Sequence, residues 1–252
     1  MSLLIRAAAT GLALLSAALY IPAAAAQVTV EGTRVIFPGS QSEVSLRLQN
    51  GPKGPVLVQV WLDDGDSDST PETASAPFVV RPPLFRLEGG KSQVIRIHFT
   101  GAPLPQDRES LYWINVLEIP PKPSAGAASS NYLQLSGRTR LKVLYRPKGL
   151  DARGAADAPR QLEWSLVSQT GNGYALQAYN PTPYYVNFSS VGLRSGGTTY
   201  SHGGIGLVAP GDTAQFPLQG LSTRPSGSAN VQFRYVNDQS GVRAMSMPLH
   251  TP

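Results

Sequence analysis

The fold of this chain is decided by one stretch, Ser110-Leu111-Tyr112-Trp113-Ile114-Asn115-Val116-Leu117-Glu118-Ile119. It is mostly apolar, it contains aromatic and β-branched residues, and it follows the turn cluster Gly101–Pro103. Those features predict a buried β-strand. Shorter segments before it alternate apolar and polar residues or are rich in β-branched residues: Val44–Leu48, Val56–Val60 and Val94–Phe99.

The segments between these strands are rich in Gly, Pro, Asn and Asp, which favour turns. Another strand, from about Tyr132 to Tyr145, is unusually long. We therefore expect roughly seven short strands and no helix between residues 27 and 147. This is the pattern of an immunoglobulin-like β-sandwich.

A second unit of about ninety residues follows, and it also reads as all β. Residues 148–160 contain several Gly, Ala and Pro residues and are interpreted as a linker. Strands are expected after it at Leu162–Val167, Tyr174–Asn180, Tyr185–Leu193, Thr213–Pro217, Asn230–Tyr235 and Val242–His250. The sequence thus predicts an all-β protein with two β-sandwich domains in tandem, at 27–147 and 161–252.

The composition excludes several classes of protein. The chain has 252 residues, of which 41% are hydrophobic, and it contains 25 Gly, 22 Pro and no Cys. Gly and Pro together stay below the roughly 25–30% of a low-complexity chain. The absence of cysteine excludes a disulfide scaffold, cysteine-ligated zinc, iron–sulfur clusters and thiol catalysis.

The first 26 residues are interpreted as a signal peptide that is cleaved after Ala26. Arg6 precedes the apolar stretch Ala7–Leu19, and the small residues Ala23–Ala26 follow. The apolar stretch is short for a membrane span, which needs roughly 20 residues. An exported protein that is not membrane-embedded is therefore expected. Its net charge of +5 is spread along the chain without a basic block, so nucleic acid is not an expected partner.

Candidate catalytic and metal-binding residues are few. The three histidines are scattered: His98, His202 and His250. Asp64, Asp66 and Asp68 have the opening spacing of a calcium-binding loop, but Ser69 and Ser75 stand where that loop needs Gly and Glu. A polar hairpin tip is the better interpretation. We expect no enzymatic activity, no cofactor and no metal.

The long strand has two interpretations. Fourteen residues span about 45 Å at roughly 3.3 Å each, which is more than a sandwich domain needs. Its first half alternates Leu133 and Leu135 with polar residues, and basic residues follow. A partner could accept this segment as an added strand. Alternatively, it is an ordinary edge strand that buries both leucines within its own domain.

A resemblance to a known family rests on motifs that span nearly the whole mature chain. The longest is Pro103-Leu104-Pro105-Gln106-Asp107-Arg108-Glu109-Ser110-Leu111-Tyr112-Trp113-Ile114-Asn115, continuing to Glu118-Ile119-Pro120-Pro121. The others, in order, are Thr33–Phe37, Pro82–Leu87, Leu141–Pro147, Asn180–Tyr185 and Tyr235–Asp238. With these motifs the sequence resembles the periplasmic pilus chaperones of the chaperone–usher pathway, which have immunoglobulin-like domains.

The resemblance implies a function and a site. A pilus subunit that lacks its last strand would receive the long strand, with Leu133, Leu135 and Gly137 at the donor positions. The two immunoglobulin-like domains would have a cleft between them, in which the subunit's C-terminal carboxylate would bind Arg34 and Lys142. The partners would be pilin-like subunits and an outer-membrane usher, and the location would be the periplasm.

The resemblance also assigns Arg86, Arg146 and Asp238 to an ion network between the domains. Gly137 departs from the family, which usually has a bulky apolar residue at this donor position. The segment 122–131 lacks the cysteines of the long-loop branch, which favours the short-loop type. Two other classes remain open at this point: a secreted carbohydrate-binding or adhesive module, and a secreted hydrolase.

Overall fold

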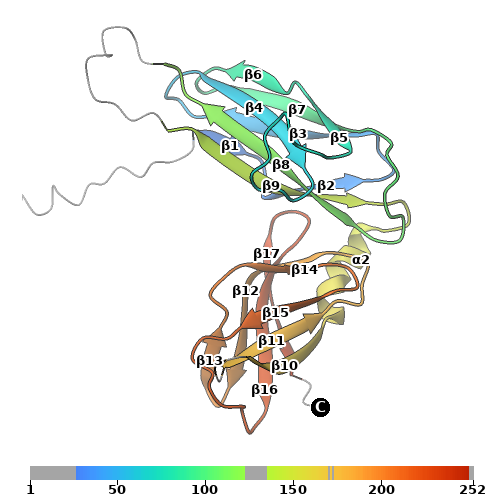
Figure 1. Ribbon diagram of the computed structural model, residues 1–252, viewed down its shortest axis with the longest axis vertical. Helices are drawn as coiled ribbons and strands as arrows, with labels where there is room; N and C mark the ends of the chain where they lie inside the picture. Colours follow the sequence, from blue (N-terminus) through green and yellow to red (C-terminus); the bar gives the residue numbers. More distant parts are fainter. Residues whose placement is uncertain (1–26, 123–134, 170, 172, 250–252) are drawn as a thin grey trace, which may run out of the picture.

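Two β-sandwich domains make up the protein, as the sequence predicts (Figure 1). The computed structural model describes residues 27–122, 135–169, 171 and 173–249. The signal peptide predicted over residues 1–26 lies outside the described residues. Figure 1 places the domains one above the other, joined at one side and separated on the other. Among the described helices, none has the length and apolar character to cross a membrane.

The first domain consists of two facing sheets. One has the order β1 (Val28–Val30), β3 (Glu43–Asn50), β7 (Ser92–Phe99) and β5 (Phe78–Arg81). The other has the order β2 (Arg34–Pro38), β9 (Gly137–Arg146), β8 (Ser110–Ile119), β4 (Val56–Asp63) and β6 (Leu84–Leu87). β2 runs parallel to β9, whereas β9, β8, β4 and β6 are paired antiparallel.

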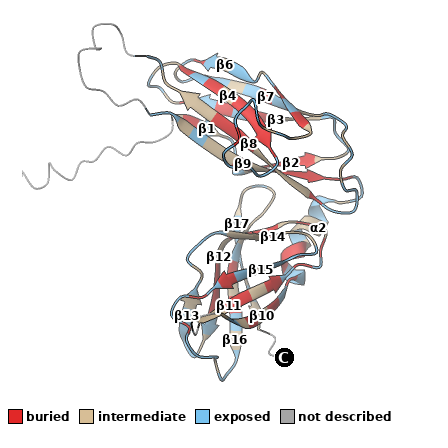
Figure 2. Ribbon diagram, in the orientation of Figure 1, coloured by how far each residue is buried: buried red, intermediate tan, exposed pale blue. Residues whose placement is uncertain are grey.

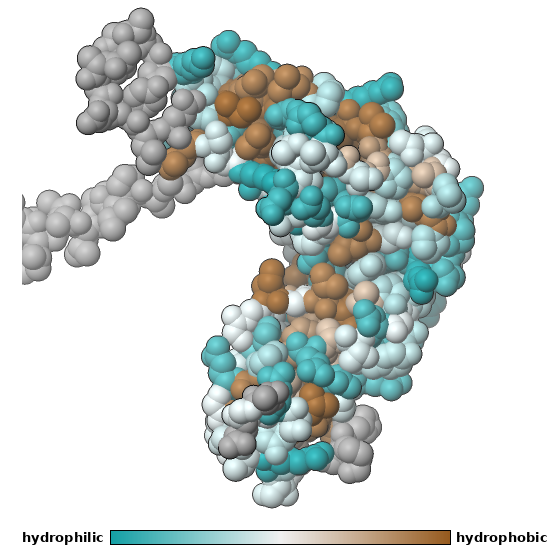
Figure 3. Space-filling view, viewed as in Figure 1, coloured by the Kyte–Doolittle hydropathy of each residue, from teal (hydrophilic) through white to brown (hydrophobic). Residues whose placement is uncertain are grey.

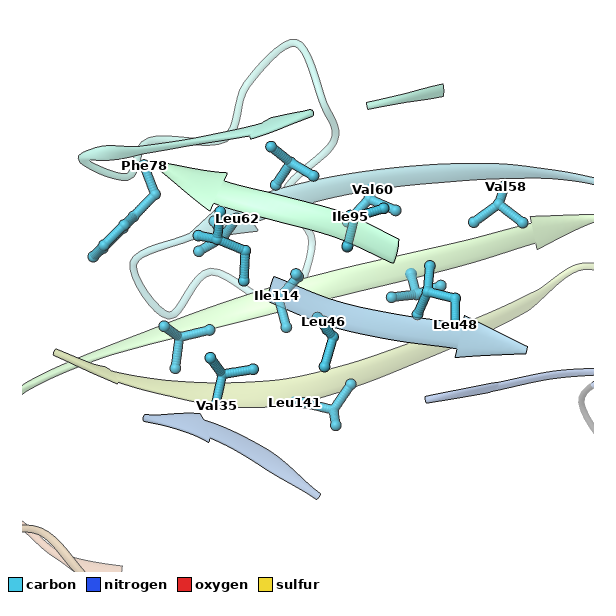
Figure 4. Close-up of a cluster of buried hydrophobic side chains, with 14 of the residues drawn as sticks. Val35, Leu46, Leu48, Val58, Val60, Leu62, Phe78, Ile95, Ile114 and Leu141 are labelled. Atoms are coloured by element: carbon cyan, nitrogen blue, oxygen red, sulfur yellow. The ribbon is translucent and has the colours of Figure 1, made fainter. Parts of the chain in front are cut away.

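The core of this domain lies between the two sheets (Figure 4). Alternate residues of the strands point inward, as the two-residue period of a strand requires. One buried cluster includes Leu48 from β3, Val58 from β4 and Ile114 from β8. Burying such a side chain contributes about 1.5–3 kcal/mol. Figure 2 shows the buried residues along the inner strands of both domains.

The second domain is a smaller sandwich. One sheet contains β10 (Glu163–Gln169), β11 (Gly173–Tyr179) and β15 (Thr213–Pro217). The other contains β13 (Thr198–Ser201), β12 (Val186–Ser195), β16 (Ala229–Val236) and β17 (Val242–Pro248), with β14 (Gly206–Val208) paired to β12. Four aromatic rings fill its centre with centroids 5.3–6.0 Å apart: Trp164, Phe188, Phe216 and Phe233.

The segment between the sandwiches, which was interpreted as a linker over residues 148–160, contains helical structure. Residues Ala152–Asp157 form α2 and residues Ala158–Gln161 form a 3₁₀ helix. Asp151 caps α2, because its side chain accepts a hydrogen bond of 2.7 Å from the backbone N–H of Gly154. Ala158 and Pro159 are buried. This segment therefore packs on the second domain instead of forming an irregular linker.

Candidate functional site

Arg34 and Lys142 lie side by side in the structure. The parallel pairing of β2 with β9 makes them partners in register. The Arg34 Nη1 donates a hydrogen bond of 3.0 Å to the carbonyl oxygen of Val236, in the second domain. Its Nε is buried without a hydrogen-bond partner in the described structure. These two residues, which the family resemblance assigned to the subunit carboxylate, are therefore brought together beside the second domain.

The pair is poised to bind an anion. Among the described residues, neither side chain has a carboxylate within 4.0 Å. Burial, together with the nearby charge of Arg34, lowers the pKa of Lys142 to about 8. Burial also lowers the pKa of Arg34, against the opposing charges of Asp238 and Glu109. A carboxylate that reached both cations would favour their charged forms.

A cavity of about 330 Å³ opens between the domains next to this pair. Arg34, Glu109 and Arg146 line it from the first domain, and residues around Asp238 line it from the second. Figure 3 shows the molecule hollowed on the side where the domains face each other. Arg34 is therefore accessible from an interdomain cleft, and Lys142 is its register partner on the adjacent strand.

An ion cluster holds the domains together at the base of this cleft. Arg146 donates to Glu109 through Nε at 2.7 Å, and to Asp238 through its two terminal nitrogens at 2.7 and 3.0 Å. Glu109 also accepts a hydrogen bond of 2.8 Å from the backbone N–H of Tyr185. One guanidinium thus serves two carboxylates and connects residues of both domains.

The cluster is buried. The side chains of Arg146, Glu109 and Asp238 are 6%, 1% and 19% exposed. Burial opposes the charge of Arg146, but the hydrogen bonds and charges of its two partners outweigh burial and raise its pKa. Burial raises the pKa of Glu109, and the nearby negative charge of Asp238 acts in the same direction. The charge of Arg146 and the hydrogen bond from Tyr185 oppose this rise but do not cancel it.

Arg86 does not belong to this cluster, and this part of the prediction is wrong. It lies on the edge strand β6 with its side chain exposed, and its Nε donates to Glu88 at 2.7 Å. The third member of the cluster is instead a second carboxylate, that of Glu109. The sequence signal was available, because Glu109 directly precedes β8 and Ser110 is the register partner of Tyr145, next to Arg146.

The predicted donor strand is only partly described. β9 begins at Gly137, so the described residues Leu135 and Ser136 precede the strand, contrary to the expected start at Tyr132. Leu133 lies outside the described residues, and Leu135 is 60% exposed. β8 pairs with β9 from Gly137 to Tyr145, whereas β2 pairs with it only from Lys142 onward. Within the described part of the chain, the other edge of Gly137–Leu141 therefore has no strand partner.

A buried polar network that the sequence analysis missed fixes β9 to its neighbours. Asp63, at the end of β4, is fully buried and accepts hydrogen bonds from Arg140, from Asn115 Nδ2 at 2.6 Å and from Ser69 Oγ at 3.2 Å. Arg138 donates to Asn115 Oδ1 at 2.9 Å through Nε and at 2.6 Å through Nη2. The network thus links β4, β8 and β9.

The electrostatics of this network favour the ionised carboxylate. Burial alone would raise the pKa of Asp63, but hydrogen bonds, chiefly from Arg140 and Asn115, lower it below its usual range. Arg140 lies over the ring of Trp113, with its guanidinium carbon 4.4 Å from the centroid, and Arg138 lies 4.9 Å from the Trp61 ring in the same way. The polar residues after Asp63 join two different sheets, so the predicted hairpin tip is instead a crossover loop.

Taken together, these features define a class of protein: a tandem pair of immunoglobulin-like domains with a basic cleft and an open strand edge. Residues 27–151 match the family described as "Pili and flagellar-assembly chaperone, PapD N-terminal domain", and residues 157–246 match "Pili assembly chaperone PapD, C-terminal domain". The chain belongs to this family of pilus-assembly chaperones of the chaperone–usher type.

Named relatives agree. The chain is 40% identical over 219 residues to the probable fimbrial chaperone YadV of Escherichia coli K12. The matched region covers 86% of this chain and 87% of the relative. The crystal structure of YadV superposes with a TM-score of 0.75 at 36% identity, over 89% of this chain and all of that chain. The Salmonella enterica SafB chaperone, solved in complex with SafA pilin, gives a TM-score of 0.71 at 31% identity, over 88% and 96%.

Proposed function

We propose that this chaperone captures a pilin-like subunit by strand addition along β9 and anchors the subunit's C-terminal carboxylate on Arg34 and Lys142. It acts in the periplasm after removal of residues 1–26, and it hands the subunit to an outer-membrane usher. The observation that carries the proposal is the unpaired edge of Gly137–Leu141 directly beside the basic pair.

Strand addition supplies main-chain hydrogen bonds and side-chain pockets together. The open edge offers N–H and C=O groups that would otherwise be a liability for aggregation. Leu135 lies two residues before β9 with an exposed side chain, so it is available to enter an apolar groove. Gly137 offers no side chain, so the matching groove position must be filled from the subunit.

The carboxylate anchor fixes the register of the added strand. Charge-assisted hydrogen bonds are about twice as strong as neutral ones, and the cleft shelters them from water. A carboxylate would also reverse the depression of the pKa of Lys142, because it supplies the opposite charge that the site lacks. The terminal carboxylate therefore sets where the subunit strand begins along β9.

Co-expression with a pilin subunit from the same bacterium tests the proposal. Arg34→Ala and Lys142→Ala, singly and together, are expected to abolish recovery of the subunit with the chaperone from the periplasm. Arg47→Ala, which removes an exposed cation from the opposite sheet, is the matched control. Thermal melting verifies that each variant is folded. Undiminished recovery of subunit by the folded double variant would refute the anchor.

The structure disfavours the alternative of a carbohydrate-binding module. Such a module needs an exposed aromatic platform, but Trp61 and Trp164 are buried. Trp113 lies beneath Arg140 and Lys142, whose charged groups are 4.4 and 5.3 Å from its ring centroid. In the described part of the chain, no tryptophan therefore offers an open face.

A further inference from the structure

The first residue after the expected signal cleavage site is held by a set of specific contacts. The backbone N–H of Gln27 donates to Glu118 Oε1 at 3.0 Å, and that of Val28 donates to Glu118 Oε2 at 2.7 Å. The side-chain Nε2 of Gln27 donates to the carbonyl oxygen of Gly54 at 2.8 Å. Its own carbonyl oxygen accepts from the N–H of Gly51 at 2.8 Å. Every polar group of the Gln27 backbone and its side-chain amide nitrogen thus has a partner.

The turn that holds the side chain is itself held by hydrogen bonds from Asn50. The buried Asn50 donates through Nδ2 to the carbonyl oxygens of Gly54 and Leu87, at 2.8 and 2.9 Å. The carbonyl of Gly54 is therefore fixed by Asn50 while it accepts from Gln27. This turn belongs to the mature domain and does not depend on the leader.

Glu118 lies near the end of β8, on the strand face that also carries the buried Ile114 and Val116. Its register partner is Gly137, where an added Cβ would lie 3.6 Å from the carboxyl carbon of Glu118. The carboxylate therefore lies directly beside the backbone of Gly137. Among the described residues, no cation lies within 4.0 Å of Glu118, so the carboxylate has two N–H donors but no counter-charge.

Signal cleavage would supply that counter-charge. Hydrolysis of the Ala26–Gln27 peptide bond consumes one water: Ala26 leaves as a carboxylate, and the nitrogen of Gln27 becomes an ammonium group. The Gln27 nitrogen lies 3.0 Å from Glu118 Oε1, which is a suitable distance for a charge-assisted bond. A free α-amino group has a pKa near 7.7–8.0, so it is mostly charged at neutral pH.

We propose that Glu118 and the turn 50–54 form a receptor for the free α-ammonium of Gln27, and that this receptor protects the new N-terminus from cyclisation. The proposal rests on the proposed removal of residues 1–26 and not on subunit binding. This site lies at one end of the first β-sandwich and recognises the chain that begins at Gln27 after signal cleavage.

Cyclisation is the reaction that threatens an N-terminal glutamine. The neutral α-amine attacks the side-chain carbonyl carbon and a C–N bond forms. One proton of the amine passes to Nε2, the bond from Cδ to Nε2 breaks, and ammonia leaves. The reaction requires a neutral amine and a side-chain amide that is free to approach it, and the receptor opposes both. Glu118 keeps the amine protonated, and Gly54 holds the side-chain amide by a separate hydrogen bond. Attack requires that both contacts break.

Intact-mass measurement of protein exported with its own leader tests the protection. Wild type and Glu118→Gln are purified from the periplasm and incubated at neutral pH. Wild type is expected to keep its N-terminal glutamine, and Glu118→Gln is expected to lose ammonia at least several-fold faster. Glu31→Gln, which removes an exposed carboxylate close to the same end of the chain, should match wild type. Equal rates in wild type and Glu118→Gln would overturn the proposal.

A second measurement does not depend on the rate of cyclisation. Wild type and Glu118→Gln are also made with a methionine ahead of Gln27, so that the nitrogen of residue 27 stays a neutral amide. Glu118→Gln should raise the equilibrium constant of unfolding about tenfold in the processed chain, and clearly less in the extended chain, because only the former loses an ion pair. Equal increases would overturn the receptor. A mature chain that begins elsewhere would overturn both the cleavage site and the receptor.

Discussion

Replacing Asp238 by asparagine tests how the angle between the two domains is held. Asp238 accepts two hydrogen bonds from Arg146, at 2.7 and 3.0 Å, and its side chain is mostly buried. The asparagine side chain would keep one acceptor oxygen and lose the charge. Its amide nitrogen would then face a donor of Arg146.

The expected cost follows from these contacts. A hydrogen bond to a charged group contributes about 1.5–3 kcal/mol, and a neutral one about 1 kcal/mol. Losing one such bond and weakening the other gives a loss of about 2 kcal/mol. The larger cost of an unpaired buried charge, about 3–5 kcal/mol, is not reached, because Glu109 still neutralises Arg146.

Denaturant unfolding and small-angle X-ray scattering measure the two consequences. Asp238→Asn should lower the free energy of unfolding and broaden the distribution of interdomain distances. Asp157→Asn is the matched control, since Asp157 is 49% exposed and pairs with Arg160 on the same helical segment. Its effect should stay within about 0.5 kcal/mol. Unfolding midpoints and scattering profiles identical to those of wild type would refute the role of the cluster.

Three further predictions concern β9 and its neighbours. The folded pKa of Lys142 (about 8) lies below its unfolded value of 10.5, so the unfolded state binds more protons between these pH values. The free chaperone should therefore gain stability from pH 8 to 10.5, and pH-dependent melts of Lys142→Met should lack this gain. Leu135→Asp should abolish subunit recovery in co-purification while thermal melting is unchanged, because a charge in an apolar groove costs several kcal/mol but Leu135 is exposed in the free protein. Asp63→Asn should cost about 3 kcal/mol and speed hydrogen exchange in β9 more than in β16, because Arg140 loses its buried partner; equal acceleration in both strands would contradict this.

Strong periodic signals made much of the fold predictable. The limits Ser110–Ile119 and Thr213–Pro217 coincide with β8 and β15, because both segments are bounded by turn residues. Short edge strands such as β5 and β6 were not predicted. Each has only four residues, and pairing on a sheet edge decides its structure more than local pattern does.

The site was predictable where backbone pairing alone brings residues together. Arg34 and Lys142 lie on adjacent strands in register, and their positions follow once the family motifs are aligned along the chain. Arg86 failed because its motif fixes its place on β6 but not the direction of its side chain, which is exposed and close to Glu88. Asp63 was missed because it ends an apolar strand, and its partners come from distant strands.

The contacts of β9 explain how this strand is held in place although part of one edge is unpaired. Its C-terminal end is fixed to the second domain through Arg146. Its second half, from Lys142 onward, is paired with β2 on one side, and β8 pairs with the strand from Gly137 to Tyr145 on the other. Arg138 and Arg140 hold its first half through Asn115 and Asp63. Ordering a segment on binding costs free energy that a preorganised one has already spent in folding. In the proposed mode of subunit capture, the polar network would therefore contribute although it lies outside the proposed carboxylate anchor: it would keep the unpaired edge of Gly137–Leu141 extended, so that a strand could pair with it.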